Sequence, residues 1–207
     1  MTQKFLLASL FCLPAINAAH ARGLDISIGN EAAQITYLSE SYGQIGIGGN
    51  DIGVGFFYNE NNDMVVNGGL LVTGNSLGAN RAFQAGVGVK GYAGYLHDPE
   101  DRTDIYPAPK RVDEDSDSVS AIGIGGKLAY ILPSRTPLSL SLEAYYAPDI
   151  TAFGDNEGLL EAVARFEVEI APTTRFFVGY RKLEVDFKNG DEYPLDETGH
   201  VGIRFSF

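Results

Sequence analysis

Residues 198–207 read TGHVGIRFSF, and apolar and polar side chains alternate one by one through this stretch. Four apolar residues share one face: Val201, Ile203, Phe205 and Phe207. The opposite face holds His200, Gly202, Arg204 and Ser206. Because successive side chains of a β-strand point to opposite faces, this period of two predicts a strand with one apolar face.

The same alternation recurs upstream, and helical spacing is absent. Counting back from the last strand gives seven more predicted strands, at 44–58, 64–74, 81–96, 118–131, 137–149, 157–170 and 174–187. Residues 23–29 and 33–40 can pair as a further hairpin about a polar turn at Asn30 and Glu31. The sequence therefore predicts an all-β chain of ten antiparallel strands, with eight strands and an N-terminal segment tucked inside as the alternative.

The lengths of the strands and of their connections separate a membrane barrel from a soluble β-sandwich, which would alternate in the same way. The predicted strands run for about 10–14 residues, whereas sandwich strands average ~5–6 and bilayer-spanning strands need ~9–11. Tight connections lie at 75–80, 132–137 and 171–174, and polar, mostly longer ones at 59–63, 97–117, 150–156 and 188–197. This asymmetry is typical of closed transmembrane β-barrels of the outer membrane.

The chain also ends on an aromatic residue inside its last strand. A closing strand of this kind is what the barrel-assembly machinery recognises in the proteins that it inserts. We therefore expect an assembly signal in this strand, formed by Val201, Ile203, Phe205 and Phe207, and contacts with periplasmic chaperones during biogenesis.

The first 21 residues have the composition of an export signal. Lys4 supplies a positive charge, residues 5–13 an apolar core of about nine residues, and residues 19–21 a small-x-small cleavage site. That core is too short to span ~30 Å of hydrocarbon as a helix. We predict a signal peptide at 1–21 and one barrel domain at 22–207. Since the single cysteine, Cys12, lies in the leader, the domain has no disulfide, catalytic thiol or thiolate metal site.

The charge balance is acidic. The whole chain has a formal net charge of −12, and removal of Lys4 with the leader makes it −13. Binding of phosphate backbones depends on clustered Lys and Arg, so a nucleic-acid partner is excluded. The expected surroundings are the lipid and lipopolysaccharide of a Gram-negative outer membrane, with the chain as a monomer that carries no cofactor.

One predicted strand departs from strict alternation. The apolar face that includes Phe176 and Tyr180 is displaced by one residue from Leu183 onward. Without a correction, a charged side chain would face lipid, at a cost of up to ~2–4 kcal/mol near the midplane. We therefore predict a β-bulge at Arg181 and Lys182.

The C-terminal third of the chain contains four distinctive motifs. They are the strand end Glu143-Ala144-Tyr145-Tyr146-Ala147-Pro148-Asp149, the pair Glu161-Ala162, the run Gly179-Tyr180-Arg181-Lys182-Leu183, and the strand from Gly202 to Phe207. Together these motifs resemble the YfaZ family of outer-membrane proteins. The N-terminal part is similar only in style. The resemblance implies a small outer-membrane barrel of uncharacterised role. The acidic stretch 97–117 is longer than the family pattern suggests, so a role of this loop could be particular to this chain.

Charged residues dominate the predicted inward face of the later strands. They are Lys90, Lys127, Glu143, Glu161, Arg165, Glu167, Glu169, Glu184, Asp186 and Arg204. A barrel of eight to ten strands has room inside only for side chains and a few waters or one small ligand. Since buried charges must pair, we expect a salt-bridged network that plugs the lumen. The alternative is a narrow passive pore in which Arg165 and Arg204 act as selectivity groups.

The acidic loop offers oxygen ligands for calcium or magnesium at Asp113, Asp115 and Asp117. It lacks the central Gly and terminal Glu spacing of an EF-hand. We expect a solvated extracellular loop without a resident metal. Divalent-ion bridging to lipopolysaccharide phosphates, or binding of a protein partner, is the alternative.

Only two histidines follow the leader, His97 and His200. Asp98 or Glu197 could orient one of them as a catalytic base, because outer-membrane hydrolases place their sites at such strand ends. No serine stands in a Gly-x-Ser-x-Gly turn. We expect both histidines to be rim residues, and the protein to be no enzyme but a structural or surface-interaction protein, or a narrow pore.

Overall fold

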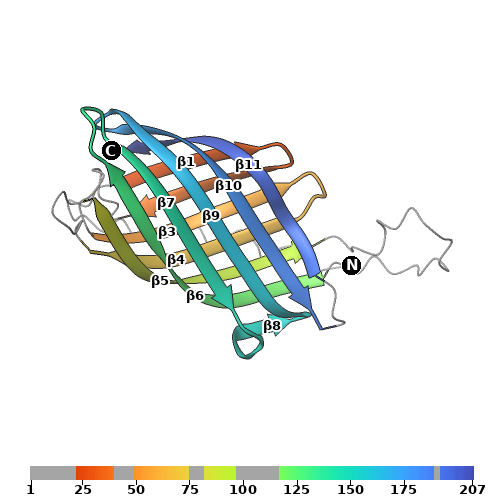
Figure 1. Ribbon diagram of the computed structural model, residues 1–207. Helices are drawn as coiled ribbons and strands as arrows, with labels where there is room; N and C mark the ends of the chain where they lie inside the picture. The colour runs from red at the N-terminus through yellow and green to blue at the C-terminus, as the bar shows by residue number, and fades with distance from the viewer. Residues whose placement is uncertain (1–21, 40–48, 75–81, 97–116, 189–191) are drawn as a thin grey trace.

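A computed structural model of the chain describes residues 22–39, 49–74, 82–96, 117–188 and 192–207 (Figure 1). Its strands are β1 (Arg22–Gly29), β2 (Ala32–Ser39), β3 (Gly49–Asn59), β4 (Met64–Thr73), β5 (Phe83–Leu96), β6 (Asp117–Leu132), β7 (Leu138–Ala147), β8 (Ala152–Gly154), β9 (Asn156–Ala171), β10 (Thr174–Phe187) and β11 (Glu192–Ser206). The 3₁₀ turn η2 (Asp149–Thr151) precedes β8. No helix in the described part of the chain is long and apolar enough to cross a membrane.

Ten of these strands close into an antiparallel barrel. They pair in the order β5-β4-β3-β2-β1-β11-β10-β9-β7-β6, and β5 pairs with β6 to complete the ring. The three-residue β8 pairs with β6 beyond the end of β7. The N-terminal hairpin is part of the wall, since Ile26 of β1 lies opposite Ile35 of β2 and Ile203 of β11. The prediction of ten strands is therefore confirmed, and the eight-strand alternative is wrong.

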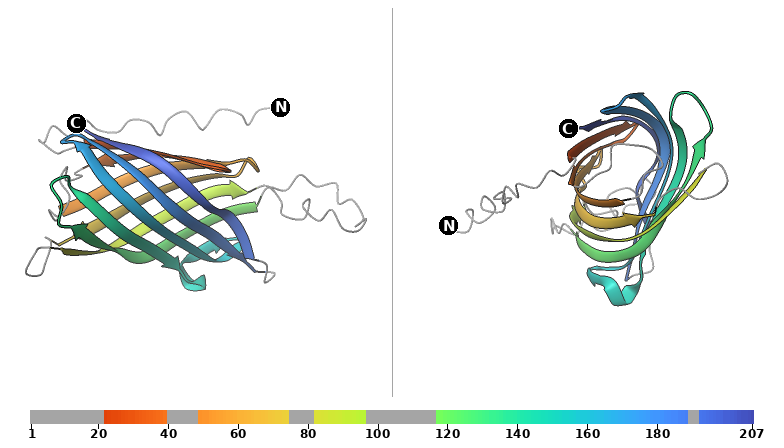
Figure 2. Two further views of the ribbon diagram at one scale, coloured as in Figure 1. Left: turned by 45° about the horizontal axis from the view of Figure 1, so that its top comes forward. Right: turned by 90° about the vertical axis from the view of Figure 1, so that its left-hand side faces the viewer.

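The two ends of the barrel differ in what they carry (Figure 2). At the terminal end, β1 begins and β11 finishes, and the connections 133–137 and 172–173 are short. At the opposite loop end lie the turns at 30–31 and 60–63 and the excursion 148–155. The predicted tight turn at 75–80 and the acidic loop 97–116 lie outside the described residues.

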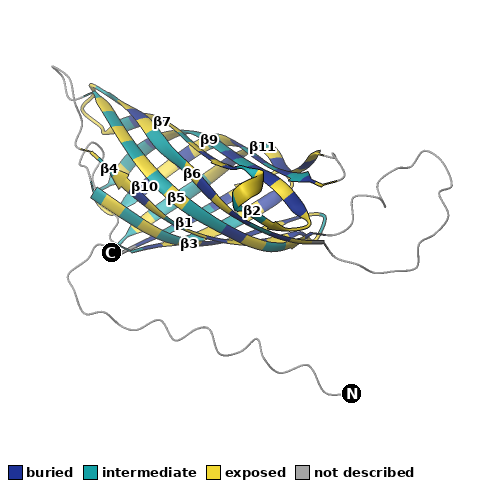
Figure 3. Cartoon of the chain, turned by 90° about the horizontal axis from the view of Figure 1, so that it is seen from below, coloured by how far each residue is buried: buried dark blue, intermediate teal, exposed yellow. Residues whose placement is uncertain are grey.

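Apolar side chains cover the outside of the barrel. Every described barrel strand contributes some of them, including Ile28, Ile35, Val54, Val66, Val89, Ile122, Leu142, Phe166, Val178 and Val201, all more than a third exposed. Along each strand these positions alternate with inward ones that are more buried (Figure 3). A soluble β-protein turns its apolar face inward. This barrel turns its apolar face outward, as membrane-spanning barrels do.

The predicted β-bulge at Arg181 and Lys182 is wrong. β10 keeps strict alternation here, so Arg181 is buried in the interior, Lys182 points outward, and Leu183 points inward again. The irregularity lies instead in β11, where Leu183 pairs with Asp196 and Glu184 pairs with Pro194, leaving one extra residue between them. β10 needs no bulge, because Arg181 is paired with Asp196 inside the barrel and the next inward residues, Leu183 and Val185, pack in an apolar part of the interior.

Glu184 and Asp186 consequently lie on the outer face, and their prediction as lumen residues is wrong. They lie opposite outward positions of β9, Leu160 and Gly158. The Lys182 ammonium is 2.9 Å from the Glu184 carboxylate on this outer face. The last strand is also longer than predicted: β11 starts at Glu192, so most of the predicted connection 188–197 is strand.

Inward glycines make room for large side chains of the neighbouring strand. The Phe177 ring lies so close to Gly202 that a Cβ there would collide with it, and with the Ile26 carbonyl oxygen. His200 covers Gly179 in the same way, with Nε2 2.9 Å from where a Cβ would stand. A narrow interior can hold aromatic rings only where the adjacent wall has no side chain, which explains glycine at these positions.

Candidate functional site in the barrel interior

The loop end of the interior is filled by apolar side chains, which we call the apolar plug. Its residues are Ala32, Phe57, Val65, Tyr92, Leu96, Val119, Ala121, Ala147, Leu159, Leu183, Val185, Phe187, Tyr193 and Leu195. All are at most 8 % exposed, and they come from strands all round the barrel, β2 to β7 and β9 to β11. Side chains from around the barrel therefore form one buried apolar cluster at this end.

A hydrogen-bonded turn fastens the plug at the rim. The Asn59 side chain donates to the Asp63 carboxylate at 2.8 Å and to the Leu195 carbonyl oxygen at 3.1 Å. The Tyr193 hydroxyl donates to the same carboxylate at 2.9 Å. Asn59 Oδ1 accepts from the backbone N–H of Asp63 at 3.0 Å. These bonds join the β3–β4 turn to the first residues of β11 at the loop end. They hold that part of β11 against the apolar plug.

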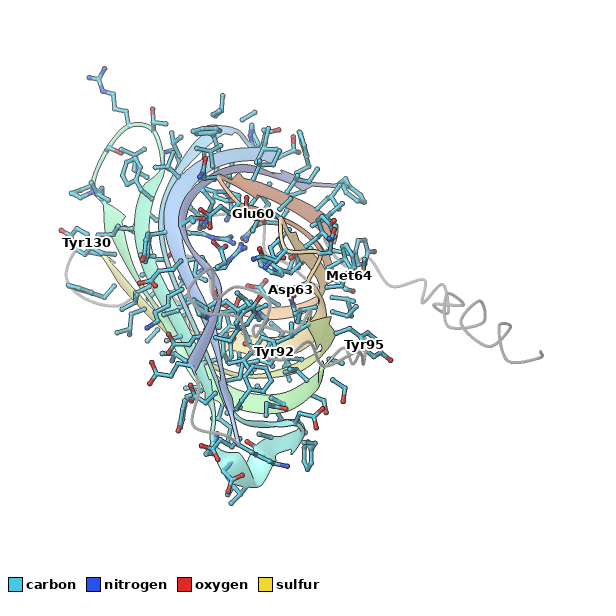
Figure 4. All side chains as sticks on the ribbon, turned by 90° about the vertical axis from the view of Figure 1, so that its right-hand side faces the viewer. Glu60, Asp63, Met64, Tyr92, Tyr95 and Tyr130 are labelled. Atoms are coloured by element: carbon cyan, nitrogen blue, oxygen red, sulfur yellow. The ribbon has the colours of Figure 1, made fainter. Side chains whose placement is uncertain are left out.

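Below the plug lies a cluster around Lys90. Its ammonium and the Tyr92 hydroxyl both donate to Glu161 Oε2, each at 2.6 Å. The same ammonium lies 5.5 Å and 5.6 Å from the ring centroids of Tyr92 and Tyr145. Figure 4, seen from the loop end, shows Tyr92 and Asp63 pointing into the barrel, while Met64, Tyr95 and Tyr130 point away from it. Lysine and glutamate thus satisfy each other across the lumen.

A second ion pair, between the neighbouring strands β10 and β11, lies beside this cluster. Arg181 Nη1 is 3.3 Å from Asp196 Oδ2, and both side chains are almost completely buried. Arg181 Nη2 also donates to the Ser27 hydroxyl at 3.2 Å. The guanidinium lies 5.8 Å from the ring centroid of Phe57, so it also contacts the underside of the apolar plug.

Toward the terminal end, Asp25 is shared by two arginines. Its Oδ2 accepts from Arg204 Nη2 at 2.6 Å and from Arg165 Nη1 at 3.1 Å. Arg175 and Glu167 form a longer pair at 3.7 Å. These contacts link β1 to β9 and β11, and β10 to β9. A charged side chain without a partner in the interior would raise the free energy of the folded barrel.

The structure brings most of the predicted lumen residues together. Lys90, Glu161, Arg165, Glu167 and Arg204 are all in the ion pairs above. Lys127 and Glu143 lie opposite each other on β6 and β7. Glu169 lies opposite Arg175.

Sequence reasoning missed five buried charged residues of the interior: Asp25, Asp63, Arg175, Arg181 and Asp196. Asp63 falls in the predicted connection 59–63. Alternation in the first hairpin and in β10 carried a signal for Asp25 and Arg175. Arg181 was missed because a bulge was predicted there, and Asp196 because it falls in the predicted connection 188–197.

His200 is not a rim residue, contrary to the prediction. It is 4 % exposed on the inward face of β11, and its ring packs against Phe177 with centroids 6.0 Å apart. Glu197 points to the other face, where its carboxylate accepts from the Tyr180 hydroxyl at 3.2 Å, so it does not orient His200. His97, Asp98, Asp113 and Asp115 lie outside the described residues, and only the backbone of Asp117 is described.

Comparison with protein families matches residues 2–207 to the family described as YfaZ precursor. The chain belongs to the YfaZ family. The resemblance seen in the C-terminal motifs is thus confirmed over nearly the whole length. No curated protein matches this YfaZ-family chain. Among solved structures it is similar to the outer membrane channel DcaP of Acinetobacter baumannii, with 17 % identity, a TM-score of 0.38, and coverage of 88 % of this chain and 54 % of that one. The chain thus spans about half the length of that channel.

The interior of the YfaZ-family barrel is therefore built in two parts. The loop end is an apolar core, and the remainder holds ion pairs. Lys90–Glu161 and Arg165–Asp25 join strands three apart in the barrel, and Arg181–Asp196 joins neighbouring strands. Within the part of the chain that the structure describes, neither ring nitrogen of His200 has a hydrogen-bonding partner. The chemistry of the interior is that of close packing and ion pairing.

Proposed function

We propose that this chain is a monomeric integral protein of the Gram-negative outer membrane, exported by the leader 1–21, whose lumen does not conduct. Its role is structural or one of surface interaction, and it is not an enzyme. The loop end faces the exterior of the cell, and the two termini face the periplasm.

The outer face supports the membrane location. Its apolar side chains form a continuous belt around the ten strands, and aromatic residues stand near both ends of that belt. Tyr58 and Tyr95 lie near the loop end; Phe83 and Tyr130 lie near the terminal end, with ring centroids 5.1 Å apart. Aromatic side chains at these two levels are typical of the interfaces between membrane and water.

The apolar plug is the observation that carries the proposal of a closed lumen. A narrow apolar constriction closes a lumen by excluding water, because ions cannot cross a segment that holds no water. Here Phe57 and Val65 from one wall belong to the same buried cluster as Leu183 and Val185 from another, and none of the four is more than 3 % exposed. Opening a passage would require these side chains to leave a packed core.

The test is the conductance of the barrel of residues 22–207, refolded and inserted in a planar bilayer, beside a variant that lacks 97–116. Circular dichroism and the mobility of the unheated protein in gel electrophoresis check that both are folded. We expect neither to conduct. Steady conductance of the intact chain would contradict the proposal and assign a narrow passive pore instead. If only the shortened chain conducts, the acidic loop closes the lumen. That result would also contradict the proposal that the apolar plug closes it.

A further inference from the structure

An inward glycine of β10, Gly179, lies at the centre of a group of polar side chains in the barrel interior. It pairs with Arg165 of β9 on one side and with His200 of β11 on the other. Because glycine has no side chain, the His200 ring leans over it, with Nε2 2.9 Å from where a Cβ would stand. Along β10, Arg181 is the next inward residue and Phe177 the one before. We call the side chains of Arg165, Arg181 and His200 around this glycine the Gly179 niche.

The side chains of the niche are buried and are held by an aromatic neighbour. The Arg165 guanidinium lies 4.5 Å from the centroid of the Phe177 ring. The same ring meets the His200 ring edge-on, with centroids 6.0 Å apart. Arg181 is 2 % exposed and His200 4 %, whereas the Arg165 side chain keeps 16 % of its surface exposed. The niche is therefore almost completely buried, and it is most open to solvent at Arg165.

Several nitrogen atoms of the niche have no hydrogen-bonding partner within the described part of the chain. They are Nε of Arg165, Nε of Arg181, and both Nδ1 and Nε2 of His200. A guanidinium Nε–H can only donate, and a neutral imidazole offers one donor and one acceptor. The niche thus presents three unmatched donors and a single acceptor. Since buried polar groups of native proteins are nearly always hydrogen-bonded, a species that accepts several hydrogen bonds fits this group.

The charges around the niche favour an anion. Three guanidinium groups, those of Arg165, Arg181 and Arg204, are paired here with two carboxylates, those of Asp25 and Asp196. The group therefore carries one positive charge beyond its own counter-ions. Hydrogen bonds from charged donors to an anion are stronger than those between neutral groups, so a single negative ion suits these donors.

The neighbouring inward carboxylates of β9 are engaged elsewhere. Glu161 pairs with Lys90 at 2.6 Å, and Glu167 pairs with Arg175 at 3.7 Å. Glu169 lies opposite Arg175, further toward the terminal end. The counter-ion that would balance the niche is therefore not supplied by β9.

We propose that the Gly179 niche binds one halide ion, which accepts hydrogen bonds from Arg165 Nε, Arg181 Nε and a ring nitrogen of His200. A halide accepts hydrogen bonds from several directions and carries the one negative charge that the group lacks. A water molecule would bring two donors of its own, for which the niche offers a single acceptor. The bound ion joins three neighbouring strands, β9, β10 and β11, beneath the apolar plug. This site goes beyond the proposed function and can fail without it.

The test uses the full-length protein, expressed and purified from membranes in its folded form. Crystals are soaked in sodium bromide, and anomalous diffraction at the bromine edge locates the bromide. In parallel, the urea midpoint of unfolding is measured in sodium chloride and in sodium gluconate at equal ionic strength, since gluconate is much larger than a halide. His200→Phe keeps a ring against Phe177 and removes both nitrogens. Tyr92→Phe is the matched control, because it removes a buried hydroxyl from the cluster around Lys90 instead.

We expect one bromide ion within hydrogen-bonding distance of a His200 ring nitrogen and of Nε of Arg165 or Arg181. Chloride should raise the urea midpoint of wild type and of Tyr92→Phe, and His200→Phe should lose most of that increase. Ordered water in the niche without bromide would overturn the inference, and so would bromide at the surface as an adventitious ion only. A chloride effect that His200→Phe retains in full would overturn it as well. Should His200→Phe not fold, the bromide map of wild type decides alone. A silent outer-membrane barrel without the halide refutes only this site.

Discussion

Removing the carboxylate of Asp25 should destabilise the barrel more than any loss on its outer face. Asp25 is 4 % exposed, and its Oδ2 is within 3.1 Å of both Arg165 and Arg204. In Asp25→Ala both guanidinium groups stay in the interior without their shared counter-ion. Loss of one partner from a buried pair costs about 3–5 kcal/mol. Glu184→Ala is the control, because its partner Lys182 is on the outer face and such pairs contribute about 0–1 kcal/mol.

The assay is equilibrium unfolding by urea in lipid vesicles, followed by far-ultraviolet circular dichroism because the chain has no tryptophan. With a slope of at most ~3 kcal/mol per molar urea, a loss of about 3 kcal/mol lowers the midpoint by at least about 1 M. At the same slope, the control should shift by no more than about a third as much as Asp25→Ala. A midpoint for Asp25→Ala that moves no further than that of Glu184→Ala would refute the reasoning.

Three further predictions concern packing, the rim and assembly. Gly202→Val forces a side chain into the Phe177 ring and should cost about 1–3 kcal/mol in urea unfolding, while Gly199→Ala changes little; equal stability of the two would contradict the close packing. Tyr193→Phe removes a donor to the buried Asp63 carboxylate and should cost about 1–3 kcal/mol, whereas Tyr58→Phe, whose hydroxyl bonds Asn62 at the surface, should cost under about 1 kcal/mol. Phe207→Ala should change the free energy of unfolding by no more than about 0.5 kcal/mol, because Phe207 is exposed beyond the last strand. It should slow insertion by the assembly machinery, measured as the folded fraction over time in outer-membrane vesicles. Unchanged insertion would remove Phe207 from the assembly signal.

The closed barrel was predictable because one physical constraint acts on every strand. Each strand crosses the same apolar belt, so each repeats the same alternation, and even the short first hairpin shows it at Ile26 and Ile35. Alternation also placed Lys90, Glu161 and Arg204 on the inward face correctly. What it could not give is the pairing between them, since Asp25 and Arg165 are 140 residues apart and no local pattern links them.

The errors have one origin. Alternation states that two faces differ, but it does not state which of them is inside. At the loop end the interior is itself apolar, so Leu183 and Val185 point inward and Glu184 points outward, the reverse of the pattern lower down the same strand. Read from the sequence alone, this reversal predicts a bulge. The polar sequence around Pro194 predicts a loop, although it is part of β11. This part of β11 pairs with β10 and extends beyond the residues that pair with β1.

The apolar plug gives the interior a thermodynamic role as well as a steric one. Most transmembrane barrels turn their apolar residues outward, so folding gains little from burial inside. Here Phe57, Leu159 and Phe187 are buried as in a soluble domain, and burial of such a side chain contributes about 1.5–3 kcal/mol in water. A conducting lumen would forgo that contribution.

The most direct measurement of whether the loop end is closed is the reactivity of single cysteines toward a hydrophilic, membrane-impermeant maleimide in the folded barrel. Residues 22–207 contain no cysteine, so each label reports one position. Ala121→Cys and Ala147→Cys place a thiol in the apolar plug with little change of volume, and Ile150→Cys places one on the exposed excursion. We predict rapid labelling at 150 and none at 121 or 147 until the barrel is unfolded. Labelling of 121 and 147 at the rate of 150 would mean that water fills the loop end and that the lumen is open.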